Sequence, residues 1–397
     1  MFLTIPAPND ATLRSVRRKV QLLATRRLLT QPGSAIAPLQ SGLLSLLERK
    51  PDDVLEAVGG VDVLSPLLML IGAVRAPEAC LADAVPPLLV ALSRKGCSSL
   101  RWDAPVARVV DARGGRVFEF DPPAEALTLD GGSLVARLAS GRALRLFPDT
   151  PDVPDGVRVR RPFHSLTNDH PVLNVSEIDT NPLAMLEDHP EKSGNAVDLG
   201  GRSAGEWVDA VRAALELVRA GLPTWYAELA LERIVPVGYD AERHSSASYR
   251  EAPGLAYLSL HPDPLTLAEV IVHETQHGKL NLLSWLDPVL RNARTCWTES
   301  PVRPDPRPLM GVLLAAHAFV PVAALHRALA EAGHPLAAGE RFERRRAEVL
   351  ASNEQGLRTL RELADPTPTG RRVLDALEEL HAELVTAAPR GLASAPQ

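Results

Sequence analysis

The chain has 397 residues, of which 45% are hydrophobic, and this is enough apolar material for buried cores in two or three parts. Its formal net charge of -6 argues against a protein that binds nucleic acid as a whole. The three cysteines have no paired spacing, and the sequence does not start with a long apolar segment. No run approaches the roughly 18 apolar residues of a membrane span. These features predict a cytoplasmic protein with no membrane partner.

The N-terminal part of the chain is predicted to be helical and to be followed by short strands. In residues 10–96, apolar side chains recur at steps of three and four between breaks at Pro and Gly. In residues 101–162 the pattern changes to short alternating segments that are typical of β-hairpins. The two expected hairpin turns are at Gly114 and Gly115 and at Ser140 and Gly141.

A polar, aperiodic stretch at residues 163–203 separates these elements from the second half, and so long a stretch is usually functional or wraps another part of the protein. Ser203 then predicts the N-cap of a helix. Two strands are expected next, and the second, "LAYLSL", reads as a fully paired core strand, although its edge could instead accept an extended peptide. Two long helices are expected to close the chain.

These elements predict an α+β protein that is mainly helical. Its C-terminal lobe is expected to be helical and metallopeptidase-like, because it carries the histidine motif "HETQH". The expected domains are a helical lobe at residues 1–100, a small antiparallel β unit at 101–165, and a metal-binding catalytic domain at 166–397.

The H-E-x-x-H motif lies in "LTLAEVIVHETQHGKLNLL" and predicts a metal-binding helix. Thr266 and Glu269 have the spacing of a capping box, so the helix is expected to begin near Leu267. His273 and His277 would then share one face, about one turn of 5.4 Å apart, and could bind one divalent ion together. The apolar surroundings favour a bound ion, because a buried imidazole pair without a partner would be costly.

A third protein ligand is needed, and the sequence offers two candidates. His317 stands in the apolar helical segment "PLMGVLLAAHAFVPVAALHRAL", where Pro321 is expected to kink the helix beside it. Glu299 stands in a proline-dense stretch that is expected to be an extended connection. We favour His317, although a lone histidine in an apolar helix is often a core residue.

Three separated blocks of the sequence resemble a known family. They are "NPLAMLEDHPEKSGNAVDLG", "GLAYLSLHPDPLTLAEVIVHETQHGKLNLL" and "SPVRPDPRPLMGVLLAAHAFVPVA". Together, over roughly residues 165–330, they resemble the HExxH-motif proteins of bacterial peptide-modification gene clusters, which are 2-oxoglutarate-dependent peptide β-hydroxylases. The resemblance implies Fe(II), with 2-oxoglutarate as cosubstrate, dioxygen, and a ribosomally made precursor peptide that is hydroxylated at a side-chain β-carbon.

The resemblance also bears on individual residues. The usual non-haem iron site has two histidines and one carboxylate, so His317 as third ligand would be a departure, with Glu299 or Asp305 as the carboxylate alternative. Arg303 and Arg307 are candidates to hold the distal carboxylate of 2-oxoglutarate, since a guanidinium pairs with a carboxylate through two parallel hydrogen bonds. Either arginine could instead pair with Asp305 and fix the loop.

Glu274 separates two competing functions. In a zinc metallopeptidase it would be the general base that acts on metal-bound water. In an oxygenase it would orient water, substrate or a ligand. A third possibility is a catalytically silent peptide-binding module with a structural metal, which is disfavoured because three protein ligands leave an open position. The hydroxylase is the leading hypothesis, and the zinc peptidase is the alternative.

Overall fold

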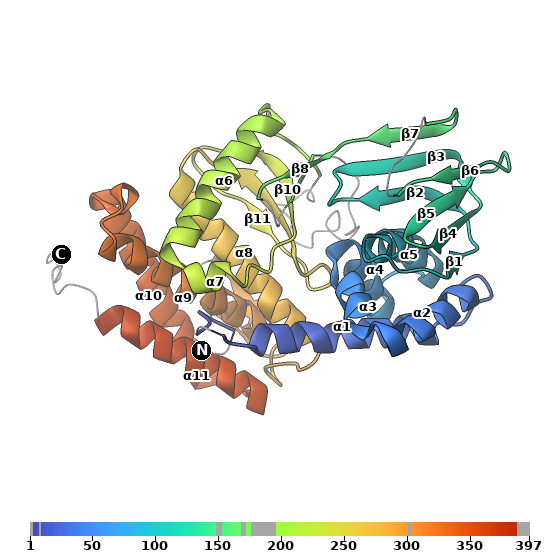
Figure 1. Ribbon diagram of the computed structural model, residues 1–397. Coiled ribbons are helices and arrows are strands. Elements are labelled where there is room, and N and C mark those ends of the chain that lie inside the picture. The colour runs from blue at the N-terminus through green and yellow to red at the C-terminus, as the bar shows by residue number, and fades with distance from the viewer. Residues whose placement is uncertain are drawn as a thin grey trace, which may run out of the picture. The chain divides into compact units, whose positions relative to one another are not determined.

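The computed structural model describes residues 3–7, 9–147, 153–167, 172–175, 196–300 and 303–386, with side chains left undescribed at 300–305. These residues form eleven α-helices and four small sheets. Figure 1 labels the helices and most of the strands along the chain. The prediction of a mainly helical α+β protein is confirmed.

The chain forms two compact units that alternate along the sequence. The N-terminal unit comprises Arg14–Asp209 and Leu231–Leu260, and the C-terminal unit comprises Met1–Leu13, Ala210–Ala230 and His261–Gln397. This division differs from the three predicted domains. Both predicted boundaries fall inside β structure, one within a strand (Leu100–Trp102) and one within a hairpin. Strand pairing between distant segments, which periodicity does not reveal, is the reason.

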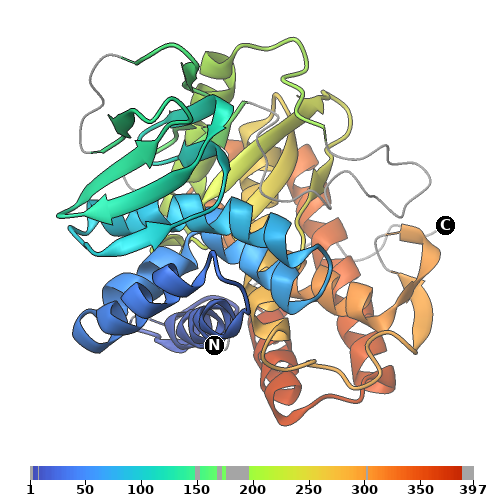
Figure 2. The ribbon, with the colours of Figure 1, turned by 90° about the vertical axis from the view of Figure 1, so that its right-hand side faces the viewer.

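Helices come first in the N-terminal unit, as predicted. They are α1 (Thr12–Thr30), α2 (Ala37–Arg49), α3 (Pro51–Gly59), α4 (Val61–Ile71) and α5 (Pro77–Arg94). Proline stands at the first turn of α2, α3 and α5, where its missing N–H leaves no hydrogen bond unmade. α5 packs against β2 (Val106–Asp111), and Figure 2 shows the light-blue helices beside the teal strands.

The two predicted hairpins are confirmed. β2 pairs antiparallel with β3 (Arg116–Ala124), and Asp111 stands opposite Arg116 across the turn at Gly114 and Gly115. Gly115 has φ 71°, a left-handed conformation in which glycine is favoured. The second hairpin joins β5 (Ser133–Arg137) to β6 (Ala143–Arg145). The remaining strands of these two sheets are β1 (Leu100–Trp102), β4 (Ala126–Asp130) and β7 (Val157–Arg160).

A mixed five-stranded sheet completes the N-terminal unit, in the order β11-β12-β10-β9-β8. β10 (Arg233–Tyr239) runs parallel to both of its neighbours, so this sheet is not antiparallel. Every residue of β12 (Leu255–Leu260) is buried, and β10 and β11 (Ser246–Ala247) pair with its two edges. This agrees with the preferred prediction of a paired core strand, although β11 pairs with only two of its residues, Tyr257 and Leu258. The other two strands are β8 (Phe163–Ser165) and β9 (Val172–Asn174).

Helices dominate the C-terminal unit. They include α8 (Pro264–Ser284), α9 (Leu309–Glu331), α10 (Glu340–Leu363) and α11 (Pro368–Thr386), after α6 (Ala204–Gly221) and the short α7 (Pro223–Tyr226). Ser203 and Glu206 cap α6 reciprocally, as predicted for Ser203. α9 packs against α8, α10 and α11 (Figure 1). α9 continues as one helix through Pro321.

α9 is also long and apolar enough to cross a membrane, but 78% of its apolar window is buried inside the protein. This is the pattern of a core helix. α3 and α4, which are bent by 81° at their junction, pass the same length and composition test only as a pair.

The proline-dense stretch is extended, as expected, and it also forms paired strands. β13 (Trp297–Ser300) and β14 (Arg303–Pro308) pair antiparallel, with Thr298 opposite Arg307. The prolines of β14 stand at every second position, where the missing N–H groups belong on the unpaired side of an edge strand. Strand pairing is therefore compatible with this composition.

Candidate metal centre

Asp263, rather than Thr266, caps the helix that carries the HExxH motif. Its side chain accepts a hydrogen bond from the backbone N–H of Leu265 at 3.0 Å, and Pro264 begins the helix. The predicted capping box of Thr266 and Glu269 is therefore wrong. Glu269 is buried instead, because α9 and α10 cover this face of α8 and supply better partners for the carboxylate.

Those partners are His326 of α9 and Arg345 of α10. Glu269 Oε1 lies 2.8 Å from His326 Nε2, and Arg345 donates to Oε2 from Nε at 3.0 Å and from Nη2 at 2.7 Å. Burial by itself would raise the pKa of Glu269, but the hydrogen bonds and charges of His326 and Arg345 lower it overall. The carboxylate thus joins three helices one turn before the first histidine of the motif.

The three motif side chains lie together on α8. One ligand atom each of His273, Glu274 and His277 lies within 4.8 Å of the others. The imidazole ring centroids are 4.3 Å apart. Glu274 lies between them, with one oxygen 3.9 Å from His273 Nε2 and the other 3.7 Å from His277 Nδ1. Helical spacing accounts for the arrangement, since the two histidines are four residues apart.

The electrostatics of this group suit a cation. Glu274 is 3% exposed, and neither its Oε2 nor His277 Nε2 has a hydrogen-bond partner among the residues described. Desolvation lowers the pKa of His277, although the Glu274 carboxylate acts in the opposite direction. The imidazole is thus neutral near pH 7, which is the form that binds metal. A divalent ion would satisfy both buried polar atoms, so the residues present fit a metal.

The surrounding residues hold α8 firmly within the C-terminal unit. Gln276 donates from Nε2 to the carbonyl oxygens of Leu3 at 3.0 Å and of His317 at 3.2 Å. Its Oε1 accepts from the indole N–H of Trp225 at 2.9 Å. Phe319 packs edge-on against the His273 ring at 4.7 Å between centroids. The hydrogen bonds of Gln276 therefore fix α8 against α9, and Phe319 of α9 also contacts the His273 ring.

The structure does not bring His317 into the group. Within the described residues the ligand-atom cluster consists of His273, Glu274 and His277. His317 is fully buried, and neither ring nitrogen makes a hydrogen bond of normal geometry. Burial lowers the pKa of His317 to about 3, helped by the positive charge of Lys279 and by His277. The ring is therefore neutral at pH 7, but it lies outside the cluster.

Of the carboxylate alternatives, only Glu299 has a described side chain. Glu299 is exposed on β13 and is not part of the cluster. The side chains of Asp305 and Arg303 lie outside the described residues, so neither of their predicted roles can be placed. Only Arg307, of the two predicted arginines, has a described side chain.

Arg307 lines an open depression in the C-terminal unit. The depression has a volume of about 390 Å³, within the range of small-molecule sites. Arg294 is a second cation in its wall, and Trp297, 64% exposed, is the largest apolar side chain. Leu314, also in the wall, interacts through its backbone with His277. Leu314 of α9 is therefore common to the wall of the depression and to the surroundings of His277.

Sequence reasoning missed the cluster of Glu269, His326 and Arg345. The three residues are far apart in the chain, and Arg345 stands in the basic run "RRR", which is typical of a solvated helix face. The spacing of Glu269 four residues before His273 places both on one helical face, but it does not indicate which helices cover that face.

Comparison with known proteins adds no identification. No family model matches the chain, and no curated protein matches it.

Proposed function

We propose that the chain is an Fe(II)- and 2-oxoglutarate-dependent hydroxylase that acts on a side-chain β-carbon of a ribosomally made precursor peptide. The observation that carries the proposal is the cluster of His273, Glu274 and His277 together with a depression that contains Arg307. The resemblance of three sequence blocks to the HExxH hydroxylase family supports it. In this proposal the C-terminal unit is the metallopeptidase-like helical lobe that carries the activity. The proposed location is the cytoplasm, and no nucleic-acid or membrane partner is proposed.

The metal would be held by His273 and His277, whose partly exposed rings lie on the accessible face of α8. Glu274 is the third group within reach, and it replaces His317 in the proposal because His317 lies outside the cluster. A set of two histidines and one carboxylate is also the usual one for non-haem iron. With three protein ligands, an octahedral ion keeps positions for other ligands.

The bound iron, together with 2-oxoglutarate, would supply the oxidising power that inserts one atom of dioxygen into a C–H bond. The balance is peptide C–H, 2-oxoglutarate and O₂ giving peptide C–OH, succinate and CO₂. Arg307 would bind the distal carboxylate of 2-oxoglutarate in the depression, where a guanidinium provides two parallel hydrogen bonds. Phe319 and the apolar side chains of α9 would exclude water from the face of His273.

The experiment that tests this function uses the full chain and synthetic candidate precursor peptides, taken from short reading frames next to its gene. With Fe(II), 2-oxoglutarate and oxygen, we expect the peptide to gain the mass of one oxygen atom without cleavage, and succinate to form in equal amount. An independent measurement is the visible spectrum under anaerobic conditions, because an iron–2-oxoglutarate complex gives a weak charge-transfer band. The proposal fails if the iron-loaded protein shows neither the band nor the mass gain.

A zinc metallopeptidase is the second candidate, because of the position of Glu274. Its carboxylate lies between the two imidazoles and keeps one oxygen without a hydrogen bond from any described residue. This is where a general base acting on metal-bound water would stand. Peptide fragments that form with zinc alone, without 2-oxoglutarate or oxygen, would favour this candidate over the hydroxylase.

A further inference from the structure

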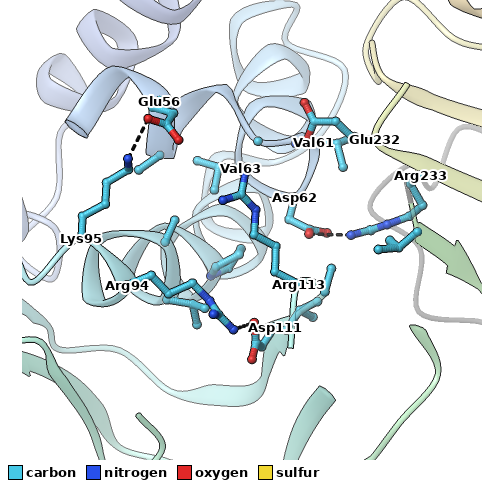
Figure 3. Close-up of a pocket in the computed structure, with 18 residues that line it drawn as sticks. Glu56, Val61, Asp62, Val63, Arg94, Lys95, Asp111, Arg113, Glu232 and Arg233 are labelled. Atoms are coloured by element: carbon cyan, nitrogen blue, oxygen red, sulfur yellow. Dashed lines mark hydrogen bonds and ion pairs between the residues drawn. The ribbon is translucent and has the colours of Figure 1, made fainter. Parts of the chain in front are cut away.

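A second pocket lies in the N-terminal unit and has no residue in common with the HExxH helix. It is enclosed by α3, α4, α5, the turn between β2 and β3, and the start of β10, with a volume of about 250 Å³ (Figure 3). Its walls combine small apolar side chains with eight charged ones. A cavity of this size holds a ligand of one or two amino-acid residues.

Ion pairs account for most of the charges. Lys95 Nζ lies 2.7 Å from Glu56, Arg94 lies 2.6 Å from Asp111, and Arg233 lies 2.5 Å from Asp62. Asp111 and Arg233 are each 1% exposed, so the pairs of Arg94 with Asp111 and of Arg233 with Asp62 are built into the wall, whereas Glu56 is 61% exposed and its pair with Lys95 lies at the rim. Figure 3 shows these three pairs on different sides of the cavity. They give the pocket a fixed polar frame without a net charge.

Two charged groups remain after this pairing. Arg113 extends from the β2–β3 turn across the pocket and makes no ion pair with any residue that the structure describes (Figure 3). Glu232 accepts a hydrogen bond from the backbone N–H of Val61 at 3.0 Å, at the start of α4, and makes no ion pair with a cation in the described part of the chain. The pocket therefore offers one free guanidinium and one carboxylate without a cation.

The rest of the wall is apolar. Val63 of α4, Pro87, Val90 and Ala91 of α5, and Val110 of β2 face the same cavity. A bound molecule would thus meet an apolar surface between the two remaining charges. Burial of an apolar side chain there would add to the electrostatic attraction.

We propose that this pocket binds an apolar α-amino acid or the C-terminal residue of a peptide, with the α-carboxylate on Arg113 and the apolar side chain against α4 and α5. The two sources share the carboxylate and the apolar side chain. They differ in the amino group, which is a free ammonium only in the amino acid and would then pair with Glu232. Recognition of a terminal carboxylate next to an apolar pocket is a known mode of peptide binding.

Calorimetric titration of the full-length protein with L-leucine, N-acetyl-L-leucine and L-leucinamide tests the proposal. Leucine should bind, and leucinamide, which lacks the carboxylate, should not. Replacing Arg113 with Gln should weaken leucine binding roughly tenfold to a hundredfold, as expected for the loss of a charge-assisted bidentate pair. Arg142→Gln is the matched control, because Arg142 is exposed in the turn between β5 and β6 and does not line the pocket.

Two further results complete the test. Ala91→Leu should abolish binding while leaving every charge in place, because the added side chain fills the cavity. Equal binding of leucine and N-acetylleucine assigns the site to a peptide C-terminus, whereas a preference for leucine that Glu232→Gln removes assigns it to the free amino acid. The proposal is overturned if neither carboxylate binds at millimolar concentration, if leucinamide binds as well as leucine, or if Arg113→Gln changes nothing.

Discussion

Glu269 of α8 lies with its Oε1 2.8 Å from His326 Nε2 of α9, one helical turn before the first histidine of the HExxH motif. Arg345 of α10 holds the other oxygen of the same carboxylate. A buried carboxylate with two partners on two different helices fixes the direction of α8. We infer that this contact positions His273 and His277, although Glu269 itself belongs to no ligand group.

Replacing Glu269 with Gln should destabilise the protein by about 2–4 kcal/mol, because it leaves Arg345 and His326 without their carboxylate. The pKa of Glu269 is lowered in the folded state from its ordinary 4.5, so the unfolded chain binds its proton more readily. The stability it contributes is therefore complete above pH 4.5 and is lost as the pH falls through the lower folded pKa. Urea unfolding at pH 7 and pH 3 measures both effects.

Glu354→Gln is the matched control. Its carboxylate lies 3.1 Å from His381 Nε2, but it is 60% exposed, so removing its charge should cost less than about 1 kcal/mol. If the two variants lost equal amounts of unfolding free energy, the ion pair of Glu269 would contribute no more than an exposed one.

Metal binding should depend on the two motif histidines and not on His317. Replacing His273 or His277 with Ala should abolish retention of iron after desalting, because two remaining ligands hold a labile ion poorly. His317→Ala should keep its iron, since His317 lies outside the ligand cluster. Metal content measured after anaerobic loading decides this. If the His317 variant lost its iron, His317 would again be the candidate third ligand, and α9 would have to shift when metal binds.

We expect His317 to affect how the free energy of unfolding depends on pH below 6.5. Its pKa is lowered to about 3 by burial, so between pH 6.5 and 3 the unfolded chain takes up a proton that the folded protein does not. Stability should fall with falling pH in this window, by up to about 1.4 kcal/mol for each pH unit. His317→Leu removes this contribution. Parallel plots of unfolding free energy against pH for the metal-free variant and parent would contradict the assignment.

Arg307 should control the affinity for 2-oxoglutarate. Its change to Leu should raise the concentration for half-maximal rate roughly tenfold to a hundredfold, since a charge-assisted bidentate pair is lost. Iron content should stay unchanged, because Arg307 is not a ligand. Arg358→Leu, on the exposed face of α10, is the control. An unaltered dependence on 2-oxoglutarate would assign Arg307 to the structure of the β13–β14 ribbon.

Glu274→Gln separates the hydroxylase from the peptidase. A peptidase that loses its general base should be slowed by about 10²–10⁴-fold at unchanged zinc content. A hydroxylase needs no proton abstracted from water, so the rate per bound iron should fall much less. The measurement is the rate of product formation divided by metal occupancy, because Glu274 is also within reach of the ion. A large loss at full occupancy would count against the hydroxylase.

Local patterns predicted much of the secondary structure and the proximity of the two motif histidines. The turns at Gly114 and Ser140, the capped start of α6 and the shared face of His273 and His277 all depend on residues close in sequence. Turn chemistry and helical spacing fix such features before any tertiary contact forms. The sequence by itself therefore determined which histidines share one face of α8.

Only the tertiary structure decided what surrounds that site. Glu269 reads as a cap in the sequence, yet α9 and α10 cover it and make it a buried anchor. His317 reads as a ligand, yet its place in the packing of α9 keeps it out of the cluster. The division into units likewise follows from parallel pairing of β10 with β9 and β12. These outcomes depend on contacts between residues tens to hundreds of positions apart, and the free energy of such contacts depends on packing that periodicity does not encode.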